Sequence, residues 1–184
     1  MKYFIHNEFN LDEKDIDEEV VRVKALLINS NDELLMGYSY KVYQFPGGHV
    51  ENGEDMLIAL QREIKEETGI SLKLQNIIPF ACNISYFKDY RNTGKNRKNY
   101  IYYYEIKTDL NPILSETNYT KEEVAGEFEL RYIKVDDIED VINDNIKVYE
   151  NPMGIATEML ELLKFYKQYR GENYEKTKRN NWKL

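Results

Sequence analysis

The spacing of apolar residues along the chain predicts strands and helices in alternation. Aliphatic and β-branched residues fill Val20–Ile28, as in a strand, and the polar turn residues 29–32 connect it to a hairpin partner at Glu33–Met36. Similar short apolar runs predict four more strands: Tyr40–Phe45, Ile77–Phe87, Tyr100–Lys107 and Glu127–Val135.

A helix is predicted from about Glu54 to Thr68. Leu57, Leu60 and Ile64 recur at helical spacing and form one apolar stripe that can pack on a sheet. Gly69 follows the last helical residue, where glycine commonly ends a helix. Strands on both sides of this helix indicate a mixed sheet flanked by helices.

The C-terminal part of the chain is predicted to be helical and then polar. Asp136-Asp137 can start a short helix, and Pro152 suits the first turn of a last helix that ends near residue 169. No segment rich in Pro, Gly or Ser divides the sequence. We therefore expect residues 1–170 to form a single domain and residues 171–184 a polar tail.

Composition excludes several classes of protein. The formal net charge of −8 argues against a protein that coats nucleic acid, although a local basic site is compatible with it. Cys82 is the only cysteine and cannot form an internal disulfide. The first ten residues lack the apolar core of a signal peptide, and no run approaches the ~18 apolar residues of a membrane span. These features predict a cytoplasmic protein that does not enter the membrane.

Acidic residues gather on the predicted helix. Glu63, Glu66 and Glu67 lie three and four residues apart, so they share one face. Carboxylates held this close repel one another and either shift upward in pKa or collect a cation, and their hard oxygens favour Mg²⁺, Mn²⁺ or Ca²⁺. Glu54 lies about two turns before Arg62, which places the two within reach of a salt bridge. Taken alone, a glutamate pair at a helix end is more typical of a solvated face.

The whole segment favours the metal-binding interpretation. Residues 48–70 match the Nudix box, G-x5-E-x7-R-E-U-x-E-E-x-G-U with U aliphatic, at all nine specified positions. The chain therefore resembles the Nudix hydrolase, or MutT-like, family over roughly residues 18–168. The resemblance implies an α/β/α sandwich with a mixed β-sheet between helices. It also implies Mg²⁺-dependent hydrolysis (Mn²⁺ can substitute) of a diphosphate linkage in a nucleoside diphosphate derivative.

The resemblance also implies roles for individual residues. Glu63, Glu66 and Glu67 take the positions of metal ligands, and one of them can also serve as the catalytic base. The carbonyl of Gly47, just before the box, matches a position that often helps to bind the metal. The catalytic set is completed by the pair that stabilises the loop and helix, Glu54 and Arg62.

Members of the family often add a metal-binding carboxylate from a later loop. Four glutamates are candidates here: Glu122, Glu123, Glu127 and Glu129. Glu127 is favoured because it lies just ahead of residues 130–135 of the predicted strand.

A basic loop supplies candidate substrate contacts. Residues 88–98 carry five cations against one acid, a net charge of +4. Arg91, Lys95 and Arg97 can receive phosphates or the end of an RNA, or the loop is a solvated hairpin tip. Tyr43, just before the box, is also placed to touch a ligand.

The substrate class stays open at this stage. Nucleoside triphosphates, nucleotide sugars, dinucleoside polyphosphates and triphosphate-ended RNA are alternatives, because loops outside the box set specificity in this family. Other nucleic acid is not an expected partner, and both a monomer and a homodimer are compatible with the sequence. Two rival functions are a non-catalytic ligand-sensing module and an isomerase of isoprenoid diphosphates. We favour the hydrolase because every box carboxylate is present.

Overall fold

The computed structural model describes residues 1–75, 77–149, 151 and 154–181, with side chains as far as residue 171. The chain divides into two compact units, residues 1–135 and 136–184. The predicted active-site residues all belong to the first unit.

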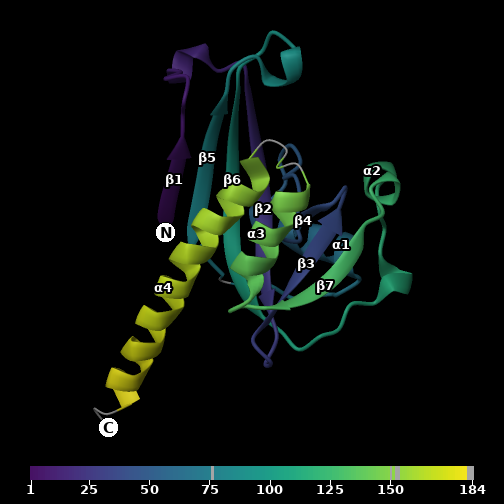
Figure 1. Cartoon of the computed structure of the whole chain (residues 1–184), viewed down its shortest axis with the longest axis vertical. Helices are drawn as coiled ribbons and strands as arrows, with labels where there is room; N and C mark the ends of the chain where they lie inside the picture. The colour runs from purple at the N-terminus through teal and green to yellow at the C-terminus, as the bar shows by residue number, and fades with distance from the viewer. Residues whose placement is uncertain (76, 150, 152–153, 182–184) are drawn as a thin grey trace. The chain divides into compact units, whose positions relative to one another are not determined.

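A mixed sheet is the centre of the first unit (Figure 1). Across the described residues its strands are β1 (Lys2–His6), β2 (Glu18–Ile28), β3 (Glu33–Ser39), β4 (Val42–Gln44), β5 (Ala81–Phe87), β6 (Arg97–Lys107) and β7 (Glu129–Lys134). Their order is β1-β5-β6-β2-β3-β4, and β7 also pairs with β3. The pairs β1–β5 and β2–β6 are parallel, whereas the other pairs are antiparallel.

The helices of the first unit are α1 (Met56–Thr68) and the short α2 (Lys121–Ala125), with 3₁₀ turns η1 (Glu13–Asp15), η2 (Tyr90–Asn92) and η3 (Leu114–Glu116). The second unit consists of α3 (Ile138–Val148) and α4 (Ile155–Asn181). No helix within the described residues is both long and apolar enough to cross a membrane.

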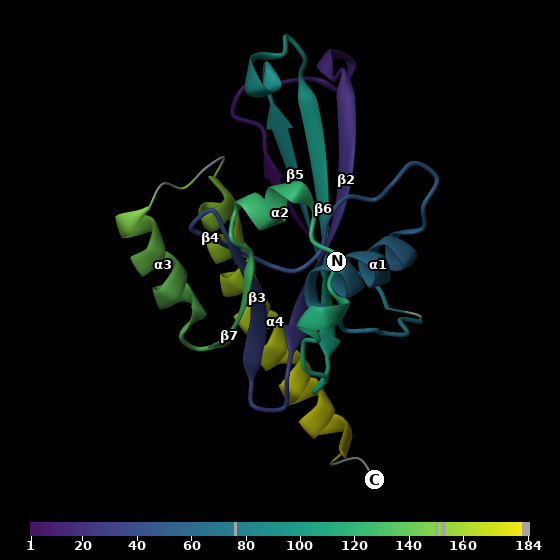
Figure 2. The same cartoon turned by 90° about the vertical axis from the view of Figure 1, so that its right-hand side faces the viewer.

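Helix α1 packs on one face of the sheet (Figures 1 and 2). Alternate residues of β2 point to that face; Val23 and Leu27 are among them, and both join the core cluster. Leu60 and Ile64 of α1 are fully buried in the same cluster, together with Tyr104 of β6. The predicted apolar stripe of the helix therefore meets the tyrosine-bearing face of the sheet.

Both ends of α1 follow from local chemistry. The carboxylate of Asp55 accepts the N–H groups of Leu57 and Ile58, which would otherwise lack partners in the first turn. Gly69 ends the helix with a φ of 72°, a left-handed conformation that favours glycine. A Cβ atom at Gly69 would also collide with the carbonyl of Ile113.

Several element boundaries differ from the sequence-based expectation. β2, β3, α1 and β7 are confirmed, and α3 begins directly after Asp137. Strand β6 begins at Arg97, so part of the expected basic loop is a strand paired with β2. Helix α4 continues to Asn181, beyond its expected end near residue 169. Pro152 lies outside the described residues. The sequence reading missed β1 and α2.

Packing of α1 can be tested with two residues on one helix. Leu60→Ala should lower the free energy of unfolding by about 2–5 kcal/mol, because it leaves a cavity in the core. Ile58, with 58% of its surface exposed, is the matched control, and Ile58→Ala should change stability by about 0.5 kcal/mol or less. Urea unfolding followed by circular dichroism measures both. An equal effect at the two positions would contradict this packing.

Candidate active site

The loop after β4 runs alongside β2. The N–H of Ala25 donates to the carbonyl of Pro46 at 2.8 Å, and the N–H of Val23 donates to the carbonyl of Gly48 at 3.0 Å. Gly47 lies between these contacts with a φ of 128°, and a Cβ atom there would collide with the carbonyl of Val23. The close approach of loop and strand therefore requires glycine at residue 47.

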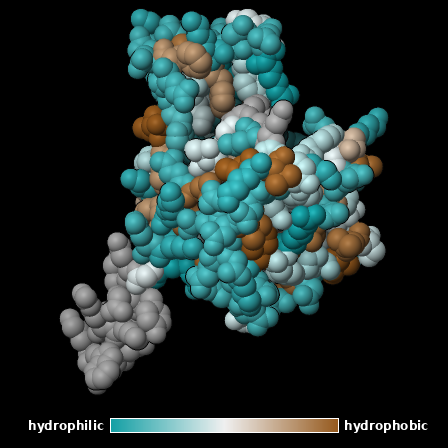
Figure 3. Space-filling model, viewed as in Figure 1, coloured by the Kyte–Doolittle hydropathy of each residue, from teal (hydrophilic) through white to brown (hydrophobic). Residues whose placement is uncertain are grey.

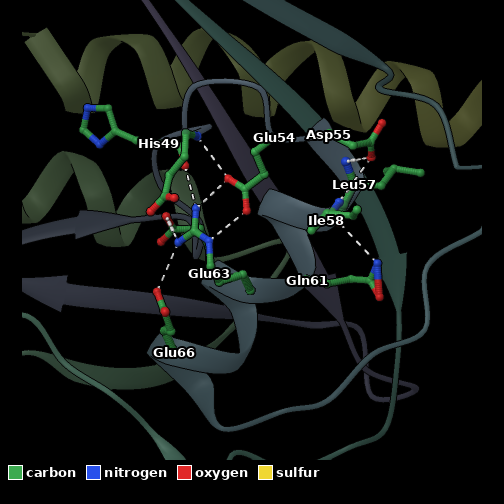
Figure 4. Close-up of polar contacts among 10 residues, drawn as sticks. His49, Glu54, Asp55, Leu57, Ile58, Gln61, Glu63 and Glu66 are labelled. Carbon is green, nitrogen blue, oxygen red and sulfur yellow. Dashed lines mark hydrogen bonds and ion pairs between the residues drawn. The ribbon is translucent and has the colours of Figure 1, made fainter.

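Arg62 connects this loop to α1. Figure 4 labels its partners His49, Glu54, Glu63 and Glu66. Its guanidinium makes two hydrogen bonds to Glu54, each 3.0 Å long, and donates to the carbonyl of His49 at 2.9 Å. The same group reaches Glu63 at 2.8 Å and Glu66 at 3.2 Å. The expected Arg62–Glu54 pair is thus present in the structure, and one planar cation offsets the repulsion between acids on the helix.

Glu67 points away from Arg62 and towards the loop. Its carboxylate is 5% exposed and accepts the N–H of Gly47 at 2.8 Å. Burial raises the pKa of Glu67 to about 7, against the opposing effects of the Lys24 charge and the Gly47 hydrogen bond. Burial also raises the pKa of Glu63, although Arg62 opposes that shift. These two carboxylates therefore lie in surroundings that favour a nearby positive charge.

Lys24 supplies such a charge. Its ammonium donates to the carbonyl of Gly47 at 2.5 Å, and its charge acts to lower the pKa values of Glu63 and Glu67. Sequence analysis missed this residue. The available signal was a lysine within the otherwise aliphatic run from Val23 to Ile28.

The expected metal ligands share a region but do not converge on a single point. Among the described residues, no group of three or more His, Cys, Asp or Glu side chains is arranged to hold a metal ion. Glu63 and Glu66 face Arg62, while Glu67 faces Gly47. The donors are nevertheless carboxylate and carbonyl oxygens, the kind that hard divalent cations prefer. A cation already contacts one of them, the Gly47 carbonyl.

Among the later carboxylates, Glu123 of α2 is close enough to affect the helix. Its charge raises the pKa of Glu67. The N–H of Asn118, shortly before α2, also donates to the carbonyl of Glu66 at 2.8 Å. Glu127, favoured from the sequence, instead lines a cavity at the far end of α2. The charge of Glu123 thus acts on the acidic helix, while the role of Glu127 as a metal ligand stays a prediction.

Three of the five cations of the basic loop, Lys95, Arg97 and Lys98, form ion pairs with acids outside the loop. Arg97 and Lys95 both contact Glu18, at 2.7 and 3.1 Å. The guanidinium of Arg91 lies over the ring of Tyr90. Figure 3 shows a largely hydrophilic surface over this end of the sheet. The predicted substrate contacts of Arg91, Lys95 and Arg97 stay predictions. Two of these residues, Lys95 and Arg97, already form ion pairs with Glu18.

Tyr43, the fourth predicted substrate contact, lies on β4. Its hydroxyl accepts a hydrogen bond from Arg131 at 3.1 Å, and its ring centroid lies 4.6 Å from that of Tyr38. Tyr43 therefore supports a group of aromatic and basic side chains at the edge of the sheet.

Comparison with known proteins identifies the family. The family model of the NUDIX domain matches residues 19–151, most of the chain. The chain belongs to the Nudix family. Nudix hydrolase 10 of Arabidopsis thaliana is 39% identical over 63 residues, which cover 33% of this chain and 23% of that protein. The match thus spans about a quarter of the curated relative.

Solved structures share the Nudix fold. The MutT protein of Methanosarcina mazei Go1 aligns with a TM-score of 0.53 at 17% identity, over 82% of this chain and 96% of that chain. The C. elegans Ap4A hydrolase in a binary complex aligns with a TM-score of 0.52 at 18% identity, over 83% and 98% of the two chains. The expected family and the expected α/β fold with a mixed sheet are both confirmed.

The Arg62–Glu54 pair should make the free energy of unfolding depend on pH in the acidic range. The hydrogen bonds from Arg62, followed by that from the N–H of Glu51, lower the pKa of Glu54 from 4.5 to about 2. A carboxylate with a depressed folded-state pKa stabilises the fold above its unfolded value and loses this contribution as the pH falls. The stability difference between wild type and Glu54→Gln should therefore be full above pH 4.5 and shrink towards pH 2.

Urea unfolding of the two metal-free proteins between pH 6 and pH 2 measures this difference. Glu51→Gln, at an exposed carboxylate of the same loop, should follow the wild type throughout. A constant difference between wild type and Glu54→Gln over the whole range would show that the ion pair does not depress this pKa.

Proposed function

We propose that this Nudix protein hydrolyses a diphosphate linkage in a nucleotide derivative, with Mg²⁺ as its metal and Mn²⁺ as a substitute. The observation that carries the proposal is the arrangement around Arg62. A single guanidinium gathers Glu54, Glu63 and Glu66, and Glu67 is buried against the Gly47 amide. All three helix carboxylates expected to bind metal are thereby held at the same loop.

Nudix hydrolases generally use divalent ions, and the donors present here fit one. Glu63, Glu66 and Glu67 would hold the ion, together with the carbonyl of Gly47. Such an ion neutralises charge on phosphoryl oxygens and lowers the pKa of a bound water.

The protein's own groups perform the remaining tasks. Arg62 fixes the direction of Glu63 and Glu66, and the Gly47 amide fixes Glu67. One of these three carboxylates accepts the proton of the attacking water. Lys24 carries a positive charge beside the Gly47 carbonyl, where it can attract an anionic substrate. These groups favour attack of water on one phosphorus of a P–O–P bridge.

A panel of substrates tests the proposal directly. Nucleoside triphosphates, nucleotide sugars and dinucleoside polyphosphates are incubated with Mg²⁺, and phosphate, pyrophosphate and nucleotide products are measured. Release of a nucleoside monophosphate from at least one class supports hydrolysis of the diphosphate linkage. Absence of products from every class, with Mg²⁺ and with Mn²⁺, would refute the proposal.

The role of the helix carboxylates is tested by conservative substitution. Glu66→Gln should lower kcat by about 100-fold or more, because it removes a charged donor whose contribution is several kcal/mol. Glu51→Gln, in the same loop and exposed, should retain the wild-type rate. Turnover is measured at saturating Mg²⁺, with circular dichroism to confirm folding. Wild-type rates in both Glu66→Gln and Glu67→Gln would show that the site is assigned to the wrong residues.

A further inference from the structure

A cavity of about 270 Å³ lies beside the candidate active site. It is lined by the end of β3, the β3–β4 turn, the end of α2 and the start of β7. Helix α2 connects the two places. Asn118, shortly before α2, donates its N–H to the carbonyl of Glu66 at 2.8 Å, and Ala125 at the end of α2 lines the cavity. The cavity therefore lies within one short helix of the acidic site.

The β3–β4 turn that lines this cavity has an unusual sequence. Ser39 pairs with Val42, which leaves Tyr40 and Lys41 as a two-residue turn with φ values of 49° and 64°. Positive φ at both positions of such a hairpin strongly favours Asn-Gly or Asp-Gly. Tyrosine and lysine are therefore poor choices for the turn itself.

Backbone conformations that are unfavourable for non-glycine residues are concentrated at this cavity. Among the described residues, eight non-glycine residues have positive φ, and four of them are Asn or Asp, which tolerate this conformation. Of the other four, three line the cavity, namely Tyr40, Lys41 and Glu127. Unfavourable backbone conformations of this kind are retained mostly at functional sites.

Contacts with α2 hold the turn in place. The N–H of Tyr40 donates to the carbonyl of Gly126 at 3.0 Å, and the hydroxyl of Ser39 donates to the same oxygen at 3.2 Å. A Cβ atom at Gly126 would lie 2.6 Å from the ring of Tyr40, so that ring lies directly against the glycine. Tyr40 is nevertheless 60% exposed, which leaves ring surface free for a ligand.

Another residue that lines the cavity offers a second flat surface. The guanidinium of Arg131 lies 3.7 Å from the ring centroid of Tyr38 and is fixed by Glu129 at 2.7 Å and by the Tyr43 hydroxyl at 3.1 Å. Aromatic rings and guanidinium planes are the surfaces on which nucleobases stack. A volume of about 270 Å³ suits a base rather than a complete nucleotide.

Glu127 gives the cavity a hydrogen-bond acceptor. Within the described residues its side chain forms no hydrogen bond or ion pair. A carboxylate accepts from the exocyclic amino group of a base. Uracil and thymine offer only the ring N3–H, which lies between two carbonyl oxygens that repel a carboxylate.

We propose that this cavity binds the nucleobase of the substrate and prefers bases with an exocyclic amino group, which are adenine, guanine and cytosine. The identity of this ligand as part of a substrate rests on the proposed function. In this arrangement Tyr40 and Arg131 provide the stacking surfaces. Glu127 accepts a hydrogen bond from the exocyclic amino group of the base instead of binding a metal ion.

The turn allows a test in which binding and stability change in opposite directions. The double variant Tyr40→Asn/Lys41→Gly supplies the residues that the turn prefers. Its Tm should rise by about 2–4 °C, while its affinity for AMP and GMP should fall about 10-fold. Calorimetric titration with AMP, GMP, CMP and UMP, without added metal, measures affinity, and scanning calorimetry measures Tm. The control Asp32→Gly, at φ 60° in the turn between β2 and β3, should leave nucleotide affinity unchanged.

Glu127→Gln tests base selection. The wild type should bind AMP, GMP and CMP more tightly than UMP, and the variant should lose most of this difference. Equal affinity of the wild type for all four nucleotides, no binding of any, or unchanged affinity in the turn variant would each overturn the proposal. Because no turnover is measured, a protein that binds GMP in this way yet hydrolyses nothing would refute only the proposed function. Hydrolysis without cavity-dependent binding would refute only this inference.

Discussion

The branched contacts of Arg62 are the constraint on which the active site depends. Glu63 and Glu66 repel each other on α1, and the loop before the helix is bound to β2 but needs a contact of its own to α1. The guanidinium addresses both problems, because it binds Glu54 and the His49 carbonyl on the loop side and Glu63 and Glu66 on the helix side. A lysine could not make these contacts together, since its ammonium lacks the planar fork of donors.

A second pair of opposite charges contacts the loop at Gly47, where it runs alongside β2. Lys24 reaches the Gly47 carbonyl from β2, and Glu67 reaches the Gly47 amide from α1. The loop peptide therefore lies between a cation and an anion that come from different elements. For His49, two residues along the same loop, desolvation, with the charges of Arg22, Lys24 and Arg97, lowers the pKa of the imidazole to about 4. Its ring is thus neutral at physiological pH, and the positive charge near the loop comes from lysine and arginine.

The sequence predicted features that lie within one segment but not contacts between segments that are distant in the chain. The α1 helix, its glycine end and the Arg62–Glu54 pair could be predicted, because each depends on spacing within a single segment. The position of Lys24 could not be predicted, and the four candidate glutamates after the box could not be ranked securely, because these contacts arise from packing of distant segments. The ion pairs of the basic loop could not be predicted for a similar reason, since Glu18, which pairs with Lys95 and Arg97, comes from the start of β2. Tyr40-Lys41 read as part of a strand, and only the pairing of β3 with β4 shows that it is a turn.

The parallel pairing of β2 with β6 has a consequence for the order of folding. Glu18 lies opposite Arg97, 79 residues away in sequence, so this central pair closes a long loop of chain. Contacts between distant segments form slowly, because the entropy of loop closure must be overcome before they contribute. The box loop and Lys24 both depend on β2 for their positions. The acidic helix can therefore form early from local interactions, whereas the geometry of the site is completed only when the two halves of the sheet have met.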